Sequence, residues 1–409
     1  MEFRLTSEQQ LFKKAVREYC EKNVAPRSRE IDEKEAGIPN DIIKGLADLG
    51  VFGCTIPEEY GGCALRGEEM QYANIAIQEL GRAELSMSLP VYMLLTVGWG
   101  GEFISYYGTK EAKQEILPKL ASGEWSWGIA VTEPGGGSDV AAIKTVATKR
   151  GNKYVLNGEK AYISQVAECQ ARGGGHCTLV VSDPSKGQRG GMTMLAVMPN
   201  QVKGVGSTTY KDMGRMGLST GGFTYKNTEI DAKYLLGQEG RGFYSCMEGF
   251  NVARAVVSAA CLGAAERCLE IAADYAKQRM AFGRPISKYQ GISFELAEDF
   301  AKLDMLKLQL QKGSWMIDKF YSEPGSFTQK DINIVISQCK WMSPLLALDV
   351  TKHAMMVLGG FGYTKQGPLE MAMRGIMSYV VGAEGAANVM KIIIARDVFG
   401  PEFVLERAD

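Results

Sequence analysis

The chain has little of what several common kinds of active site require. It contains only two histidines in 409 residues, His176 and His353. Sites built from several histidines, including most catalytic zinc sites and histidine-dependent triads, are therefore nearly excluded. The nine cysteines form no Cys-x-x-Cys pair, and their odd number argues against a disulfide framework. We therefore expect no metal site, a reducing cytoplasmic compartment and cysteines that serve mainly as small core residues.

An excess of charge and a long apolar run are also missing. The 46 lysines and arginines nearly balance the 47 acidic residues, which gives a net charge of −1. We therefore expect neither nucleic acid nor a membrane surface as a partner. No apolar run approaches the roughly 20 residues that span a bilayer, and the first residues show no signal peptide. The absence of a G-x-G-x-x-G motif argues against a Rossmann domain.

The hydrophobic pattern divides the chain into three segments. Residues 6–128 show a helical period, residues 129–240 contain short β-rich runs with many glycines, and the helical period then returns in long stretches. One pair of runs, 154–156 and 160–164, flanks Asn157-Gly158 and predicts a hairpin. We therefore expect an α+β protein, mostly α, with an N-terminal helical domain (1–128), a middle antiparallel β domain (129–240) and a C-terminal helical domain (241–409).

Two motifs have chemistry suited to a phosphorylated ligand. The run Glu133-Pro134-Gly135-Gly136-Gly137-Ser138-Asp139 contains three successive glycines, whose backbone N–H groups can approach an anion closely. The run Arg279-Met280-Ala281-Phe282-Gly283-Arg284-Pro285 follows a helix and carries two planar guanidinium groups that suit a pyrophosphate. From the glycines alone, a flexible connection is the favoured explanation of the first run, and a solvated helix end is the alternative explanation of the second.

One carboxylate stands among small and apolar residues. Glu384 follows Val380, Val381 and Ala383 and precedes Gly385. Poor hydration raises the pKa of such a carboxyl group towards the range of a general base. The alternative is a glutamate near a helix N-terminus that interacts favourably with the helix dipole.

Taken in order, these fragments and several others resemble the acyl-CoA dehydrogenase family, and the resemblance covers nearly the whole chain. The matching motifs are 56–62, 131–134 with 137–139, 157–160, 236–243, 279–283 with Gln290, and 358–363. The resemblance implies a flavoprotein that binds FAD and has a C-terminal four-helix bundle. It also implies an oxidoreductase that acts on acyl-CoA thioesters, assembles as a homotetramer and passes electrons to an electron-transferring flavoprotein.

The resemblance also implies roles for individual residues. Glu384 would be the catalytic base, because Ala253 stands where some members carry the base on another helix. The cofactor would contact Val131, Thr132, Gly137, Ser138, Tyr162, Ser164, Arg279, Phe282 and Gln290, with Gly359 and Gly360 supplied by a second copy. The substrate would contact Ser138, Asn251, Arg254, Ala383 and Gly385.

Several departures from the family pattern bear on the cofactor and the substrate. Met356 replaces a glutamine common before the glycine pair, and Arg374 lies one residue further from Glu384 than usual. The usual Tyr-Glu-Gly-Thr is Ala-Glu-Gly-Ala at 383–386, which opens volume beside the base. Pro90 stands where glutaryl-CoA enzymes carry an arginine, within the apolar run 89–94.

The run 384–388 most resembles members that act on unusual acyl groups in anaerobic degradation, such as glutaryl-, cyclohexanecarboxyl- or benzylsuccinyl-CoA. We therefore predict dehydrogenation of a bulky, cyclic or aryl acyl-CoA. The sequence leaves open an enoyl-CoA reductase that runs the reverse reaction, or a catalytically silent protein that binds acyl-CoA or flavin.

Overall fold

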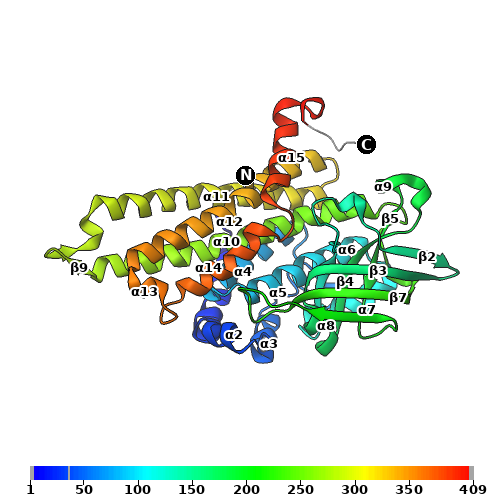
Figure 1. Ribbon diagram of the computed structural model, residues 1–409, viewed down its shortest axis with the longest axis horizontal. Coiled ribbons are helices and arrows are strands. Elements are labelled where there is room, and N and C mark those ends of the chain that lie inside the picture. The colour runs from blue at the N-terminus through cyan, green and yellow to red at the C-terminus, as the bar shows by residue number, and fades with distance from the viewer. Residues whose placement is uncertain (1–3, 36, 405–409) are drawn as a thin grey trace.

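A computed structural model describes residues 4–35 and 37–404 of the chain. Long C-terminal helices form one half of the molecule and a sheet forms the other, while the N-terminal helices pack beside both (Figure 1). The α+β class and the order of helices, strands and helices are confirmed. Among the described residues, no helix combines the length and hydropathy that a membrane span requires.

The N-terminal part is helical. Its α-helices are α1 (Ser7–Tyr19), α2 (Ser28–Lys34), α3 (Asn40–Asp48), α4 (Glu69–Ala83), α5 (Ser88–Leu95), α6 (Phe103–Tyr107) and α7 (Lys110–Ala121). A π-helix, η4 (Thr96–Glu102), joins α5 to α6. Helix α1 begins with a capping box, in which the Thr6 hydroxyl accepts from the Gln9 backbone N–H and the Gln9 side chain accepts from the Thr6 N–H.

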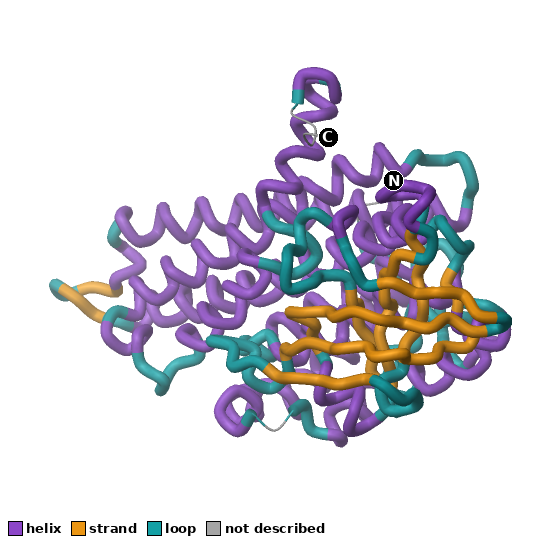
Figure 2. Tube along the Cα trace, turned by 45° about the vertical axis from the view of Figure 1, so that its right-hand side comes forward, coloured by secondary structure: helices purple, strands orange, loops and turns teal. Residues whose placement is uncertain are grey.

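The middle part is a mixed sheet. Its strands are β1 (Ser126–Ala130), β2 (Val146–Arg150), β3 (Lys153–Ser164), β4 (Gly174–Val181), β5 (Met192–Val197), β6 (Val205–Thr209), β7 (Thr220–Asp231) and β8 (Leu235–Leu236). The order is β6-β7-β3-β2-β4-β5-β8, and β1 pairs with β4 (Figure 2). Most pairs are antiparallel as expected, but β4 is parallel to both β1 and β2. Strands β2 and β3 and helix α8 (Val166–Arg172) form the crossover between β1 and β4.

The predicted Asn-Gly hairpin is wrong. Strand β3 runs straight through Asn157 and Gly158, and its pairing with β7 shifts register between Leu156 and Gly158. A Cβ atom at Gly158 would lie 2.7 Å from the Cα of Thr145. Glycine is therefore needed here for close backbone approach in an irregular strand, and not for a turn. The chain reverses earlier, at Gly151, where φ is 61°.

The C-terminal part is a bundle of long helices. It contains α10 (Gly242–Gln278), α11 (Gln290–Ser322), α12 (Gln329–Leu358) and α14 (Leu369–Val381). Between α10 and α11 lie the short strands β9 (Met280–Ala281) and β10 (Arg284–Pro285), and α13 (Gly360–Tyr363) follows α12. Helix α10 packs against α4 and α12 and also contacts β5. It therefore joins all three parts, and α15 (Ala387–Phe399) projects from the bundle at the top of Figure 1.

Candidate active site

A cavity of about 700 Å³ lies between the sheet, helices α5 and α10, and the turn that follows α14. Its apolar wall includes Val91, Leu94 and Leu95 from α5 with Met247 and Phe250 from α10. Of the apolar run 89–94, only Val91 and Leu94 line this cavity, and the other side chains of the run are buried in other parts of the core. The cavity therefore has an apolar end and, on the sheet side, a polar end.

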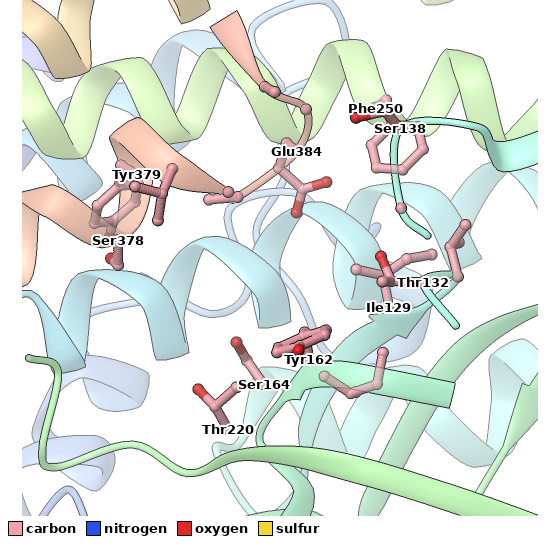
Figure 3. Close-up of a pocket in the computed structure, with 18 of the residues that line it drawn as sticks. Ile129, Thr132, Ser138, Tyr162, Ser164, Thr220, Phe250, Ser378, Tyr379 and Glu384 are labelled. Carbon is pink, nitrogen blue, oxygen red and sulfur yellow. The ribbon is translucent and has the colours of Figure 1, made fainter. Parts of the chain in front are cut away.

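Glu384 lies on the cavity wall in a turn with unusual backbone geometry. Ala383, Glu384 and Gly385 have φ values of 36°, 62° and 116°. Such positive values are uncommon for residues with a side chain, so the surrounding contacts must hold the turn in place. Arg254 Nε donates to the Glu384 carbonyl oxygen at 2.9 Å. The turn directs the carboxylate into the cavity, opposite Tyr162 and Ser164 (Figure 3).

The surroundings of Glu384 raise the pKa of its carboxyl group to near pH 7. Burial raises the pKa of Glu384 to about 7, while the hydrogen bond from Trp99 and the charges of Arg254 and Lys340 oppose the increase. Trp99 Nε1 donates to Glu384 Oε1 at 3.2 Å. A carboxyl group with this pKa can both accept and release a proton near pH 7. Glu384 also lies before the first residue of α15, Ala387, so the cavity-facing interpretation is favoured over a simple first-turn glutamate.

Two buried cations support the turn that carries Glu384. Arg254 is only 5% exposed, and burial lowers its pKa to about 10. Lys340 on α12 is buried, and its Nζ donates to the Tyr379 carbonyl oxygen at 3.2 Å, near the end of α14. Burial lowers the pKa of Lys340 to about 8. Both cations therefore compensate for a negative charge on Glu384 and hold the backbone on which it sits.

Asn251, predicted to face the substrate, does not line the cavity. It is 2% exposed, and its Nδ2 donates to Gln329 Oε1 at 3.0 Å. Its Oδ1 accepts from Arg254 Nη1 at 3.5 Å. The side chain points towards the first residue of α12 because of its place on α10. Asn251 therefore supports Arg254 and has no direct contact with the cavity.

The other residues predicted near the flavin and the thioester meet at this cavity. Its lining includes Val131, Thr132, Gly137, Ser138, Tyr162, Ser164, Arg254, Ala383 and Gly385. Tyr162 lies where the pairing of β3 with β7 shifts register, and its φ is 58°. This irregularity turns the Tyr162 side chain out of the regular strand, and it is 70% exposed. An accessible aromatic face therefore lies beside the Ser164 hydroxyl (Figure 3).

Sequence reasoning missed an ion pair that joins two of the motifs. Glu133 Oε1 accepts from Lys160 Nζ at 2.9 Å and from the Thr145 N–H at 2.9 Å. Lys160 Nζ also donates to the Val131 carbonyl oxygen at 3.0 Å. Lys160 is buried, and burial lowers its pKa to about 8. The ion pair fixes the segment 131–133 against β3. In the sequence, only the opposite charges of Glu133 and Lys160 indicated that the two motifs could pair.

Arg215 is a second residue that the sequence did not reveal. Its Nη2 donates to Thr220 Oγ1 at 3.2 Å and its Nη1 to Ser164 Oγ at 3.4 Å. All three residues line the cavity. Within the described part of the chain, the buried Arg215 Nε and Asp212 Oδ2 atoms have no hydrogen-bond partner, and Asp212 Oδ2 has only an ion pair with Arg215 Nη2 at 3.7 Å. Such orphaned polar atoms fit a polar ligand that would complete their hydrogen bonding.

Three family models match the chain in order. They are the N-terminal domain (residues 6–124), middle domain (128–228) and C-terminal domain (240–399) of acyl-CoA dehydrogenase. The chain belongs to the acyl-CoA dehydrogenase family. The predicted family, the enzyme class and the dependence on FAD are therefore confirmed.

Individual relatives agree with this assignment over almost their full length. An acyl-CoA dehydrogenase of Bacillus subtilis is 32% identical, over 97% of this chain and 99% of its own. A 3-(aryl)acrylate reductase of Clostridium sporogenes is 31% identical, over 96% of this chain and 99% of its own. The structure of a glutaryl-coenzyme A dehydrogenase with glutaryl-CoA is 26% identical, covers 100% of this chain and 99% of its own, and has a TM-score of 0.89.

The acyl-CoA dehydrogenase family uses FAD, and the cavity fits part of it. The Tyr162 ring offers an aromatic surface, the Ser164 and Thr132 hydroxyls offer hydrogen bonds, and Arg215 has a buried Nε atom without a partner among the described residues. Gly137 and Ser138 lie on the exposed rim, where backbone N–H groups can approach an anion.

The remaining residues predicted to bind FAD lie elsewhere. The residues Arg279, Phe282, Gln290, Gly359 and Gly360 are exposed and do not line the cavity. They flank β9 and α13, at the end of the bundle opposite the sheet (Figure 1). Arg254 and the end of α10 are separated by roughly 36 Å at about 1.5 Å per helical residue. One chain therefore does not bring this group together with Glu384.

Proposed function

We propose that Glu384 is the base of an FAD-dependent α,β-dehydrogenation of an acyl-CoA thioester with a bulky, cyclic or aryl acyl group. The observation that carries the proposal is the carboxylate on the cavity wall, which faces Tyr162 and Ser164 and whose pKa is about 7 (Figure 3). A thioester bound beside the aromatic surface of Tyr162 would present its α carbon to this carboxylate.

The residues of the chain account for the removal of the α proton. The thioester carbonyl acidifies the α C–H bond, and the Glu384 carboxylate accepts the α proton. Bound FAD would supply the acceptor for the β hydrogen and its electron pair, which would leave a double bond between Cα and Cβ. Arg254 and Lys340 offset the negative charge of Glu384 before the proton arrives. The apolar side chains Leu94 and Phe250 restrict water, which strengthens these interactions.

The arrangement of cofactor-binding residues supports a homotetramer. Val131, Thr132, Gly137, Ser138, Tyr162 and Ser164 would hold FAD within one chain, while Arg279, Phe282, Gln290, Gly359 and Gly360 would contact the FAD of a second copy. Phe282 is 95% exposed, and Phe294, Phe300 and Met305 on α11 are also exposed. Large apolar side chains of this kind are usually covered in an assembly.

The family resemblance also gives an electron-transferring flavoprotein as the expected electron acceptor and anaerobic degradation as the expected context. The cysteine usage gives the cytoplasm as the expected compartment. The domain boundaries remain as proposed, at 1–128, 129–240 and 241–409.

The proposed acyl group follows from the apolar wall and from the small residue beside the base. Val91 and Leu94 line the cavity, and Ala383 leaves space that a tyrosine would fill. The C. sporogenes relative, whose name specifies an aryl acrylate, is similar over almost the whole chain. These observations favour a ring-bearing acyl group over a short linear one.

A reductase is the second candidate function, and that same relative favours it, because its name describes a reductase. The reverse reaction would use the same residues: protonated Glu384 would donate its proton to Cα, and bound, reduced FAD would supply the hydride that the β carbon receives. A pKa of about 7 gives Glu384 comparable amounts of both protonation states near neutrality.

Anaerobic mixing of the holoenzyme with thioesters tests the proposal. Saturated 3-phenylpropanoyl-CoA or cyclohexanecarboxyl-CoA should bleach the oxidised flavin faster than butyryl-CoA does. Cinnamoyl-CoA, added to enzyme reduced beforehand, reports the reverse direction by return of the yellow colour. If no thioester changes the flavin in either direction, the protein is a silent binding protein and the proposal is wrong.

A further inference from the structure

Trp99 from the N-terminal part of the chain contacts the proposed base directly. It lies in the π-helix η4, its side chain is fully buried, and its Nε1 donates to Glu384 Oε1 at 3.2 Å. The two residues are 285 positions apart in the sequence. The hydrogen bond therefore connects the N-terminal helices to the turn that carries Glu384. No motif in the sequence predicted this contact.

The fold is shaped around this indole. A Cβ atom at Gly249 of α10 would lie 2.5 Å from the Trp99 ring, so only glycine leaves enough space. The Trp99 ring packs edge-on against Phe250 at 5.3 Å and against Phe103 at 5.2 Å between centroids. These contacts restrict the ring to one orientation, in which its N–H group points at Glu384.

The irregular helix that carries Trp99 is equally closely packed. A Cβ at Gly100 would lie 2.8 Å from Trp127, and one at Gly101 would lie 2.3 Å from Thr55 Oγ1. Single π-helical turns occur frequently at functional sites because they redirect side chains. The glycines of η4 thus allow the close approach that puts the indole behind the carboxylate.

We propose that Trp99 is a positioning residue for the base: it holds Oε1 of Glu384, so that Oε2 is the oxygen presented to the α carbon of the substrate. This inference rests on the proposed function of Glu384. The other titratable or charged groups that act on the carboxylate are Arg254 and Cys246 on α10 and Lys340 on α12. Trp99 is the neutral donor that can orient one oxygen without adding a charge.

The substitution Trp99→Phe tests the role because it keeps an aromatic ring and removes the N–H group. A lost hydrogen bond to the ionised form raises the pKa of the carboxyl group. The acid limb of the rate of flavin reduction by 3-phenylpropanoyl-CoA should therefore move upward by about half to one pH unit. On the alkaline plateau the rate should fall about tenfold, because the oxygen is no longer fixed. The thioester concentration for half-maximal rate should change little.

Trp127→Phe is the matched control. Trp127 is also fully buried and packs against η4 beside Trp99, but its Nε1 donates to Cys177 Sγ at 3.2 Å and not to Glu384. The variant therefore removes an indole N–H from the same packing without removing a hydrogen bond to the base. This variant should keep the acid limb of the wild type. An unchanged acid limb in Trp99→Phe, or an equal shift in Trp127→Phe, would overturn the inference.

A second measurement avoids dependence on the folding of Trp99→Phe. The chain has five tryptophans, and labelling them with 5-fluorotryptophan gives each a fluorine resonance. One resonance should shift with pH around the pKa of Glu384 and lose that shift in Glu384→Gln. If no resonance behaves in this way, the inference is wrong. If the flavin of Glu384→Gln is still bleached by the thioester, the proposed function itself is wrong. If Glu384→Gln is inactive but the acid limb of Trp99→Phe is the same as in the wild type, only the role of Trp99 is contradicted.

Discussion

Two of the regions that hold buried carboxyl groups can be compared directly, and only one of these two has the form of an active site. In the first, Glu384 lies on the cavity wall next to Trp99, Arg254 and Lys340. In the second, Glu69, Glu102 and Asp318 lie close together between α4, η4 and α11. Burial raises the pKa of the carboxyl group in both regions.

The second region contains only locally satisfied or orphaned carboxyl groups. Asp318 accepts from the backbone N–H groups of Met70 and Gln71, and burial raises its pKa to about 8. Glu102 is 2% exposed, and its Oε2 has no partner among the described residues. No ion pair forms with Glu69, Glu102 or Asp318 in the described part of the chain. None of the three lines the cavity.

A raised pKa does not by itself identify a catalytic base. Both environments favour the neutral carboxyl group through desolvation. Only Glu384 combines that effect with access to a cavity and with two cations that stabilise its ionised form. The following variants test the contrast between the two regions.

The largest effect is expected from Glu384→Gln. The amide keeps the size of the side chain but cannot accept the α proton, so the rate of flavin bleaching should fall by about a thousandfold. Glu102→Gln, the equivalent change in the second region, should leave the rate near that of the wild type. Stopped-flow absorbance with the same thioester measures both, and equal losses in the two variants would remove the distinction between the regions.

A smaller but still large loss is expected from Arg254→Gln. The change removes the donor to the Glu384 carbonyl oxygen and a cation that favours the ionised carboxylate. The rate should fall about a hundredfold, and its acid limb should move to higher pH. Arg267→Gln is the control, because Arg267 lies on the same helix but is exposed and pairs with Glu270. A normal acid limb in Arg254→Gln would show that Arg254 does not act on the base.

A more selective effect is expected from Ala383→Tyr. The larger side chain would fill the space beside the base and should slow 3-phenylpropanoyl-CoA about tenfold more than butyryl-CoA. The ratio of the two bleaching rates measures this change. Ser378→Ala, at another position of the cavity lining, is the control. Equal slowing of both thioesters by Ala383→Tyr would contradict the proposed ring-binding space.

The smallest effect is expected on stability, in the second region. Because burial raises the pKa of Glu102, its folded form stays protonated at a pH where the unfolded form is ionised. Stability from this group is therefore present at low pH and is lost as the pH rises. Glu102→Gln should stabilise the holoenzyme by about 1–2 kcal/mol at alkaline pH and by less at acid pH. Thermal midpoints at both pH values measure the difference, and a gap that shrinks with rising pH would contradict the explanation.

Local patterns in the sequence predicted the elements well. Strand β5, Met192–Val197, lies in the segment where short β-rich runs were predicted, and α1, with its capping box at Thr6, lies in the segment predicted to be helical. The strand pattern and the helix cap both depend on residues that are close together in the sequence, so their geometry is set by the local backbone. Asn157-Gly158 shows the limit, because the same dipeptide that favours a tight turn also serves an irregular strand that packs against Thr145.

The candidate site was predictable only where a motif marked it. The motifs at 131–139 and 383–386 meet at the cavity, as the resemblance implied. The Trp99 and Arg215 contacts depend on packing between segments far apart in the chain, and no local spacing encodes them. Arg279 and Gly359 belong to recognisable motifs, yet the length of the helices puts them at the other end of the bundle.

The most direct measurement is the pH dependence of flavin bleaching by an acyl-CoA thioester in the wild-type holoenzyme under anaerobic conditions. With Glu384 as the base, the rate should fall about tenfold for each pH unit below about 7, the pKa of this carboxyl group. A rate that stays constant well below that pH would mean that another group, or none, accepts the α proton.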